Sequence, residues 1–352
     1  GRSPYGISRQ LFKERGIRFI PDEGLLSWSV PGCVSGWAAL NERFGPTPLA
    51  KLLEPAIRTA RDGFPVSEII AGSWRASQTR LRRWEHSADT YLIDGKRAPR
   101  FGEMFRNPRL AQSYQLIADQ GATAFYGGAI ARAIVKFSQE NGGFFTMKDF
   151  RDHRADWVAP VSTSYRGHDV WELPPNGQGI AALQMLNVLE QHDLSAMGFG
   201  SSQYVHLLVE AKKLAFADRA RFYADPEFNA LPVQELISKE YADRQNKRID
   251  LSRAATGVTA GDPQLERGDT VYLTVVDKDR NCCSLIQSIY YGFGSQVTPG
   301  KVGFAMQNRG ALFSLAERHL NRLEPHKRPF HTIIPAMVTK GGQPWFCFGV
   351  MG

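Results

Sequence analysis

Two pairs of β-rich runs near the end of the chain constrain its fold more than any other feature. Residues 270–277 and 282–288 are rich in β-branched or alternating apolar residues, and the polar residues 278–281 join them. Residues 333–338 and 345–350 repeat this arrangement around Gly341 and Gly342. Alternation interrupted by turn residues is typical of β-hairpins. The end of the chain is therefore predicted to form two hairpins.

The first two thirds of the chain read mainly as helices separated by glycine and proline. The clearest helix is predicted for residues 204–223, with a capping serine pair before it and Pro226 after it. Shorter helices are predicted for residues 35–45, for residues 47–61 with Thr47 as N-cap, and for two segments of 107–137 broken at residues 127–129. Helices first and strands late favour an α+β fold. No linker divides residues 1–352, so a single domain is expected.

The net charge of +8 raises the question of an anionic partner. Basic residues are scattered, and the densest run lies between Trp74 and Trp84. We interpret this run as a solvated helix face, the alternative being a nucleic-acid groove, for which no recognition motif is present. A small acidic molecule is therefore a more plausible partner than nucleic acid.

Cysteine, histidine and apolar residues exclude further classes. The four cysteines show no CxxC spacing and the eight histidines no HxxxH or HExxH spacing, so we predict neither a disulfide framework nor a metal site. The sequence contains no stretch of 18 or more apolar residues, so we predict no membrane span. Both ends read as the middle of a longer protein. An upstream signal is left open, and with it a cytoplasmic, periplasmic or secreted location.

Thr270 has two interpretations. As the first residue of a β-rich run, it is an ordinary β-former. As a nucleophile it would need a base, because a threonine hydroxyl is weakly reactive, and a free α-amino group beside it can serve. That amine titrates near pH 7.7–8.0 in model peptides, so it can accept and return a proton. Thr270 gains such an amine only if the bond after Asp269 is cut.

The surroundings of Thr270 resemble the processing site of the gamma-glutamyltransferase family of N-terminal-nucleophile hydrolases. That pattern is a threonine, a hydroxyl residue four positions on, Val-Val-Asp, and a turn ending in Asn, matched here by Thr270, Thr274, residues 275–277 and Asn281. Other segments follow the family's order over nearly the whole chain, namely residues 30–32, 121–126, 145–150, 158–167, 174–179, 210–219 and 327–329.

The resemblance implies a four-layer αββα sandwich and a precursor cut before Thr270. Residues 1–269 would then belong to a large subunit and residues 270–352 would begin a small one, with a homodimer of the pair left open. The implied reaction is acyl transfer from a small amide or peptide substrate, and it needs no cofactor.

The resemblance also assigns catalytic roles. Ser288 matches the strand position whose hydroxyl hydrogen-bonds the nucleophile. Gly352 matches the first of two glycines whose backbone N–H groups stabilise the oxyanion. Residues 174–179 match a loop near the active site, although from sequence alone a glycine-rich turn before a helix at Ile180 is the simpler interpretation.

Substrate-binding positions depart from the family's pattern. Leu312 stands where typical members have the Asp that binds the substrate ammonium. His331 and Thr332 replace a serine pair that helps to hold the α-carboxylate, and Tyr290 replaces an Asn. Arg2 lies two places away from the register of the carboxylate-binding Arg. These departures are similar to the branch that includes cephalosporin-acylase-like proteins.

Arg309 and His331 are the cationic candidates at pocket positions. The simpler interpretation of each is a structural hydrogen bond, but a guanidinium also suits bidentate binding of a carboxylate. Three functions therefore stay open. They are a gamma-glutamyl hydrolase or transferase, an amidase for other acyl groups such as glutaryl amides, and an uncut proenzyme or scaffold.

Overall fold

The computed structural model describes residues 1–257 and 269–350. Their contacts group into two compact units. The first contains Gly1–Asp156, Ile289–Leu315 and Leu323–Lys327, and the second contains Trp157–Ser288, Ala316–Arg322 and Arg328–Gly352. The chain enters each unit more than once, so both units are built from segments far apart in the sequence.

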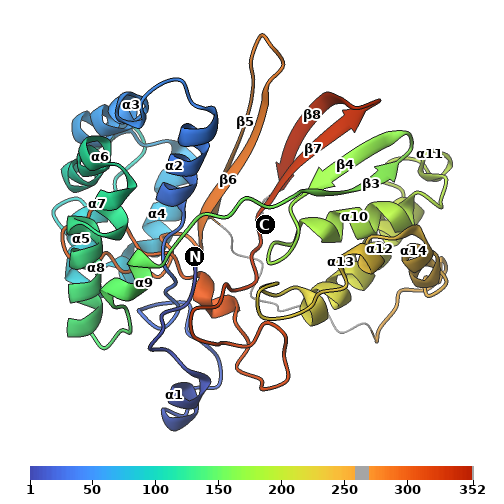
Figure 1. The fold of residues 1–352 in the computed structure, drawn as a ribbon, viewed down its shortest axis with the longest axis horizontal. Coiled ribbons are helices and arrows are strands. Elements are labelled where there is room, and N and C mark those ends of the chain that lie inside the picture. Colours follow the sequence, from blue (N-terminus) through green and yellow to red (C-terminus); the bar gives the residue numbers. More distant parts are fainter. Residues whose placement is uncertain (258–268, 351–352) are drawn as a thin grey trace. The chain divides into compact units, whose positions relative to one another are not determined.

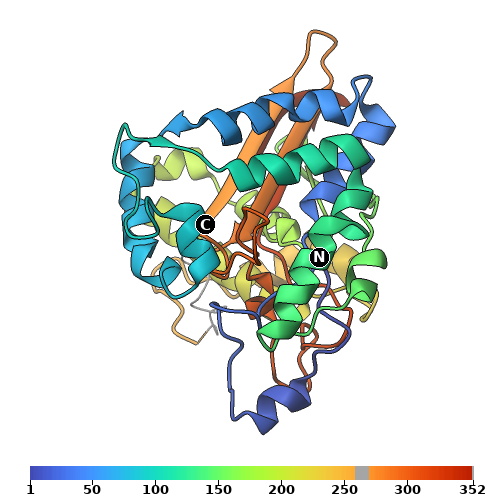
Figure 2. The ribbon, with the colours of Figure 1, turned by 90° about the vertical axis from the view of Figure 1, so that its left-hand side faces the viewer.

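The first unit is mainly helical (Figures 1 and 2). Its core contains the fully buried Trp28, Phe145 and Phe150, and the later segment adds the buried Val297 and Met306 to the same cluster. Residues 289–315 are thus part of this core rather than an appendage. The elements of the unit are α1 (Arg9–Glu14), α2 (Cys33–Phe44), α3 (Leu49–Asp62), β1 (Phe64–Pro65), α4 (Glu68–Leu81), α5 (Glu85–Tyr91), β2 (Met104–Phe105), α6 (Pro108–Gln120), α7 (Ala122–Tyr126), α8 (Ala129–Glu140), α9 (Met147–Arg151) and the 3-10 helix η2 (Arg309–Leu312).

The helices predicted here are present, with corrections at their ends. Helix α3 begins at Leu49, and Pro48 takes the N-cap position that we predicted for Thr47. Residues 107–137 hold α6, α7 and the start of α8, one helix more than predicted. The additional break falls at Gly121, whose φ of 66° is readily adopted by glycine alone.

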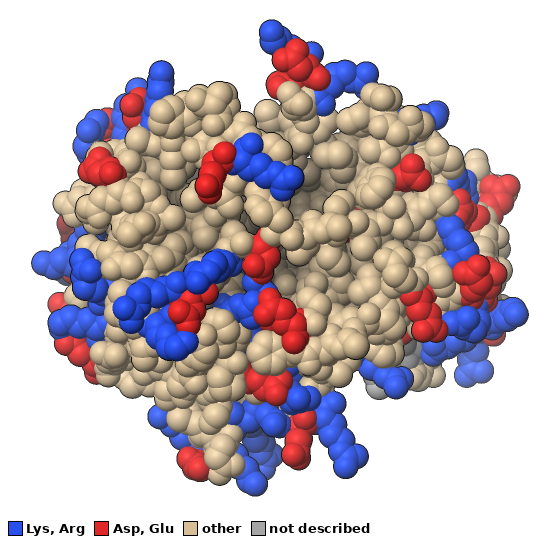
Figure 3. Space-filling view, viewed as in Figure 1, with Lys and Arg blue, Asp and Glu red and all other residues tan. Residues whose placement is uncertain are grey.

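The arginine run on α4 and just beyond it faces solvent on one side. Trp74 is buried on the inner side, whereas Arg80 and Arg83 form ion pairs with Glu23 at 3.5 and 2.8 Å. On the face shown in Figure 3, basic and acidic side chains are interspersed. The prediction of a solvated helix face is confirmed for this run.

The second unit is built on a four-stranded sheet in the order β3-β4-β7-β8, all antiparallel (Figure 1). Its strands are β3 (Val161–Tyr165), β4 (His168–Glu172), β7 (Ile334–Lys340) and β8 (Gln343–Val350). The β7–β8 turn uses Gly341 and Gly342, both with positive φ, as tight hairpins require. The predicted hairpin is therefore confirmed.

The other predicted hairpin consists of β5 (Asp269–Val276) and β6 (Cys282–Tyr290). In its turn, the carboxylate of Asp277 accepts hydrogen bonds from the backbone N–H of Asp279 at 2.9 Å and of Asn281 at 2.8 Å. Strand β5 lies close against β8 at Gly349. A Cβ added to Gly349 would come within 2.3 Å of the Tyr272 ring. Glycine at position 349 therefore allows this close approach.

Helices complete the second unit. They are α10 (Gly179–Leu189), α11 (Leu194–Met197), α12 (Ser202–Phe222), α13 (Val233–Leu236) and α14 (Lys239–Asn246). Helix α12 matches the clearest predicted helix, and the Ser201 side chain caps it by accepting from the backbone N–H of Tyr204 at 3.1 Å. No helix in the described part of the chain is both long and apolar enough to cross a membrane.

The pair β3–β4 corrects the expectation that strands are confined to the last third. These strands lie among the helices in sequence and join β7 and β8 in one sheet. A mixed α+β class is confirmed. The four-layer sandwich and the boundaries of the two subunits stay predictions.

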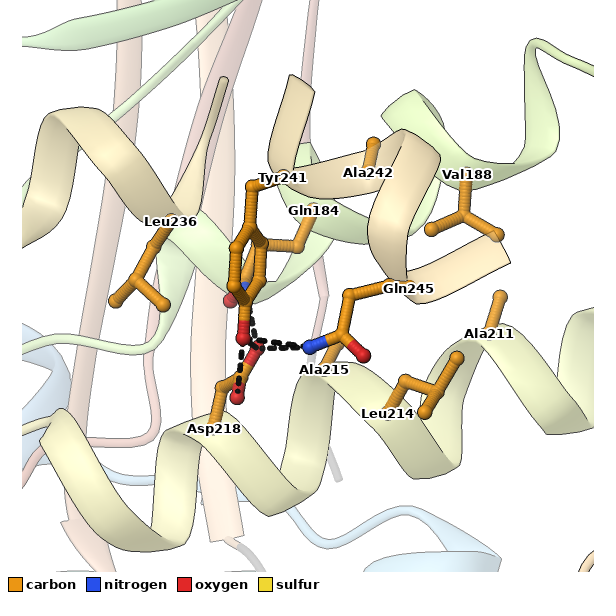
Figure 4. A pocket seen from close by; sticks show the side chains of 10 residues that line it. All are labelled: Gln184, Val188, Ala211, Leu214, Ala215, Asp218, Leu236, Tyr241, Ala242 and Gln245. Carbon is orange, nitrogen blue, oxygen red and sulfur yellow. Dashed lines mark hydrogen bonds between the residues drawn. The ribbon is translucent and has the colours of Figure 1, made fainter. Parts of the chain in front are cut away.

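A polar network ties three helices of this unit together (Figure 4). The Asp218 carboxylate accepts hydrogen bonds from the Tyr241 hydroxyl at 2.9 Å, from the Gln184 amide at 2.7 Å and from the Gln245 amide at 3.4 Å. Beside them lies a cavity of about 10 Å³, enough for roughly one water molecule. Burial raises the pKa of Asp218, and these donors offset part of that rise. The network therefore makes a buried acid tolerable in the helix layer.

Glu172, the last residue of β4, is another buried acid of this unit. Its side chain is 1% exposed and lies against the start of α10, where a Cβ on Gly179 would come within 2.5 Å of its Oε2 atom. Burial raises the pKa of Glu172 to about 8, although the backbone N–H of Leu173 lowers it in part. Glu172 therefore carries a proton at neutral pH.

This buried acid should make stability depend on pH. Because the folded pKa lies above the unfolded value of about 4.3, Glu172 favours folding below that value and this contribution is lost as the pH rises through about 8. The free energy of unfolding of the wild type should therefore fall between about pH 5 and 8.5. We expect this fall to be smaller by roughly 2–5 kcal/mol in Glu172→Gln. Urea titrations at both pH values measure it. The exposed Glu240→Gln is the control, and an equal loss in both variants would refute the assignment.

Candidate functional site

The β5–β6 hairpin places Thr270 beside Ser288. Both residues belong to the second unit, and the Thr270 hydroxyl donates a hydrogen bond to the Ser288 hydroxyl oxygen at 3.0 Å. Thr270 follows Asp269 within the continuous strand β5, and its side chain is half-buried. The antiparallel pairing of the hairpin brings the two hydroxyls together from positions 18 residues apart. A hydroxyl so placed can orient and polarise a threonine nucleophile.

The segment that carries His331 and Thr332 is bound to the loop that follows β4, also in the second unit. The backbone N–H of His331 donates to the Asn176 carbonyl oxygen at 2.8 Å, and Gly177 and His331 form a parallel β-bridge. The Asn176 amide donates to the Pro329 carbonyl oxygen at 2.6 Å. The loop at residues 174–179 is therefore both the glycine-rich turn before α10 and the support of two predicted site residues.

The ring of His331 also has a defined orientation. Its Nδ1 atom accepts a hydrogen bond from the backbone N–H of Ile333 at 3.4 Å. A neutral imidazole with an accepting Nδ1 carries its proton on Nε2. His331 can therefore offer an N–H donor on its other nitrogen.

Tyr290, Arg309 and Leu312 belong to the first unit, and all three are buried, with 3%, 2% and 8% of their surface exposed. The Arg309 guanidinium carbon lies 5.1 Å from the centre of the Tyr290 ring, a cation–π distance. Tyr290 has a φ of 80°, which is unusual for an aromatic residue. Burial lowers the pKa of Arg309 to about 9, so its guanidinium stays charged at neutral pH.

Helix η2, which carries Arg309 and Leu312, is fixed to the loop near residues 22–29. The backbone N–H of Gly310 donates to the Ser27 carbonyl oxygen at 2.9 Å, and a Cβ at Gly310 would come within 2.5 Å of that oxygen. The Asn308 amide donates to the Asp22 carbonyl oxygen at 2.8 Å. The backbone of helix η2, from which the Arg309 side chain extends, is therefore held by its neighbours on both sides.

Gly352 and Arg2 are the remaining predicted site positions. Gly352 lies outside the described residues. Arg2 is buried, and its guanidinium donates to the His326 carbonyl oxygen at 3.0 Å, which is a structural contact. Among residues 1–257 and 269–350, no group of His, Cys, Asp or Glu side chains could hold a metal ion.

Sequence reasoning missed the residues that support the site. It marked residues 174–179 and 210–219 as family segments but assigned no role to Asn176, Gln178 or Arg219. Their partners lie 41 to 154 positions away in sequence. No local pattern indicates such pairs, whereas the motifs themselves indicated where to look.

The chain is similar to known proteins over nearly its whole length. The Glutathione hydrolase-like YwrD proenzyme of Bacillus subtilis (strain 168) is 43% identical over 354 residues, which cover 100% of this chain and 66% of that protein. The Acylase ACY 1 proenzyme of Pseudomonas sp. (strain V22) is 37% identical over 349 residues, covering 98% and 62%. The crystal structure of cephalosporin acylase from Bacillus halodurans has a TM-score of 0.92 at 40% identity, covering 100% of this chain and 65% of that one.

The chain thus spans about two thirds of the length of these relatives. A family model described as Gamma-glutamyltranspeptidase matches residues 1–352. Because this match extends over the whole sequence, as the resemblance predicted, the chain belongs to the gamma-glutamyltranspeptidase family.

Proposed function

We propose that this chain contributes the catalytic threonine of an acyl-transfer enzyme. The observation that carries the proposal is the hydrogen bond between Thr270 and Ser288 at the start of β5. It is supported by a family whose members include a glutathione hydrolase-like proenzyme and an acylase proenzyme. The four-layer sandwich implied by the family resemblance is part of the same proposal.

The proposed reaction begins with maturation. The Thr270 hydroxyl attacks the carbonyl carbon of Asp269, the peptide nitrogen becomes the free α-amino group of Thr270, and water hydrolyses the resulting ester. In each later turnover the α-amino group takes the hydroxyl proton while the oxygen attacks a substrate amide. The departing amine receives that proton, and water or a second amine releases the acyl group. The sequence resemblance assigns stabilisation of the oxyanion to backbone N–H groups that include that of Gly352.

Leu312 favours acyl groups that lack the gamma-glutamyl amine. A leucine cannot accept a hydrogen bond from an ammonium group, and burial of an ammonium against it costs desolvation energy. The buried, charged Arg309 suits a carboxylate. The sequence resemblance also assigns His331 and Thr332 to positions that hold a carboxylate in the family. A glutaryl-type acyl group therefore fits these residues better than a gamma-glutamyl group, which is the second candidate.

Cleavage before Thr270 is the first test. We expect the wild-type protein to yield two fragments on a denaturing gel, with Thr270 as the first residue of the smaller one. Thr270→Ala should stay a single chain without activity, because it lacks the attacking oxygen. Intact mass and N-terminal sequencing measure both results. A Thr270→Ala protein still cut at this bond would rule out self-processing, and an uncut wild type at neutral pH would favour the scaffold or proenzyme alternative.

Ser288 supplies the second test. Its hydroxyl oxygen is the acceptor for Thr270, so Ser288→Ala should slow cleavage roughly tenfold to a hundredfold, the effect of losing one hydrogen bond to a reacting group. Ser288→Thr keeps the hydroxyl and should cleave within about threefold of wild type. Fragment formation followed over time gives the rates. Equal rates for the Ala and Thr variants would remove Ser288 from the mechanism.

Selectivity at position 312 is the third test. A charge-assisted hydrogen bond is worth roughly 1.5–3 kcal/mol, and its absence should disfavour gamma-glutamyl substrates by about tenfold to a hundredfold. We therefore expect a higher kcat/KM for glutaryl p-nitroanilide than for gamma-glutamyl p-nitroanilide. Leu312→Asp should narrow or reverse this preference, with Leu312→Asn as the uncharged control. If the wild type prefers the gamma-glutamyl compound, another residue binds the ammonium and the proposed selectivity is wrong.

A further inference from the structure

The peptide that carries His331 and Thr332 is held at three successive points by one loop. The Asn176 side chain binds the Pro329 carbonyl oxygen, the Asn176 carbonyl binds the N–H of His331, and the Gln178 amide donates to the Thr332 carbonyl oxygen. These contacts all lie within the second unit. The direction in which the His331 and Thr332 side chains leave the backbone therefore depends on the loop.

The orientation of the Gln178 amide is set by Arg219 of α12. The Arg219 Nη1 atom donates to Gln178 Oε1 at 2.9 Å, between side chains that are 5% and 9% exposed. A guanidinium has only donors, so the amide oxygen must face Arg219 and the amide nitrogen must face Thr332. Arg219 thus acts on Thr332 through Gln178.

Arg219 also contacts two aromatic rings. Its guanidinium carbon lies 4.0 Å from the centre of the Phe216 ring and 5.3 Å from that of Phe330. Phe216 lies one turn earlier on α12, and Phe330 directly precedes His331. A planar guanidinium stacked on rings is well ordered, and lysine does not reproduce this geometry. Helix α12 therefore fixes the position of Arg219 against the segment that carries His331 and Thr332.

We propose that Arg219 and Gln178 are positioning residues that fix the His331–Thr332 peptide for recognition of the acyl carboxylate. The inference rests on the proposed function, because it takes His331 and Thr332 as part of the carboxylate site. Misplacement of a binding group by about 1 Å can cost on the order of a hundredfold in rate. Loss of the contacts from Arg219 to Gln178 and from Gln178 to Thr332 should therefore weaken the binding of substrates whose acyl group carries a carboxylate. Substrates whose acyl group has no carboxylate should be nearly unaffected.

Gln178→Glu is the sharpest variant. A glutamate keeps the shape of the side chain and the bond to Arg219, but presents a second acceptor to the Thr332 carbonyl oxygen. Arg219→Lys keeps the charge and removes the planar donor pair. Tyr241→Phe is the matched control, because it deletes a part-buried hydrogen bond to Asp218, the neighbour of Arg219 on α12. It leaves the contacts of Arg219 with Gln178 and of Gln178 with Thr332 intact.

The measurement compares glutaryl p-nitroanilide with butyryl p-nitroanilide, which has no carboxylate. Relative to Tyr241→Phe, we expect Gln178→Glu and Arg219→Lys to raise KM for the glutaryl compound about tenfold to a hundredfold. Their kcat/KM for the butyryl compound should change less than about threefold, and cleavage before Thr270 should proceed in all variants.

Equal losses on both anilides would overturn the inference, because they would show a general structural defect. Unchanged glutaryl kinetics in Gln178→Glu would overturn it as well, even if Arg219→Lys failed to fold. An uncut and inactive wild type would instead refute the proposed function, and this inference with it. A cut, active wild type with unaffected variants would refute the inference alone.

Discussion

The antiparallel pairing of β4 with β7 is the constraint on which the second unit depends. It joins residues 169–171 to residues 337–339, and with them an early hairpin to a late one. In an antiparallel pair the end of one strand lies beside the start of the other. The loop that follows β4 and the segment that precedes β7 therefore leave the sheet at the same end. This is why Asn176 and Gln178 can hold the peptide of His331 and Thr332.

Buried polar groups in this unit are expensive, and the fold satisfies them with long-range partners. Asp218 and Arg219 are neighbours on α12 but serve different partners. Asp218 collects donors from α10 and α14, whereas Arg219 binds the amide of Gln178. Helical geometry points adjacent residues about 100° apart, so one short motif can serve the helix layer and the site segment together. Two residues of the family segment at 210–219, Asp218 and Arg219, therefore have structural roles.

The residues to which the sequence resemblance assigned catalytic and substrate-binding roles are divided between the two units. The hydroxyl pair of Thr270 and Ser288 suits activation of a threonine. Leu312 and Arg309 differ from the pattern that binds a gamma-glutamyl group, and both are buried. A charged guanidinium kept in a dry environment interacts strongly with a carboxylate, whereas a leucine offers an ammonium nothing. The relatives include a protein named as glutathione hydrolase-like and one named as an acylase. Such names are expected if one catalytic machinery serves substrates with different acyl groups.

The sequence by itself determined the local elements and the family. Helix α12 with its serine cap and the two late hairpins follow from caps, alternation and turns, which act over a few residues. The pairing of Thr270 with Ser288 was implied by the family resemblance. It did not reveal β3 and β4, because a strand of five residues among helices carries too weak a periodic signal. Only the tertiary structure decided that Gln178, Arg219 and Thr332 meet, since a buried polar side chain finds its partner through the packing of distant segments.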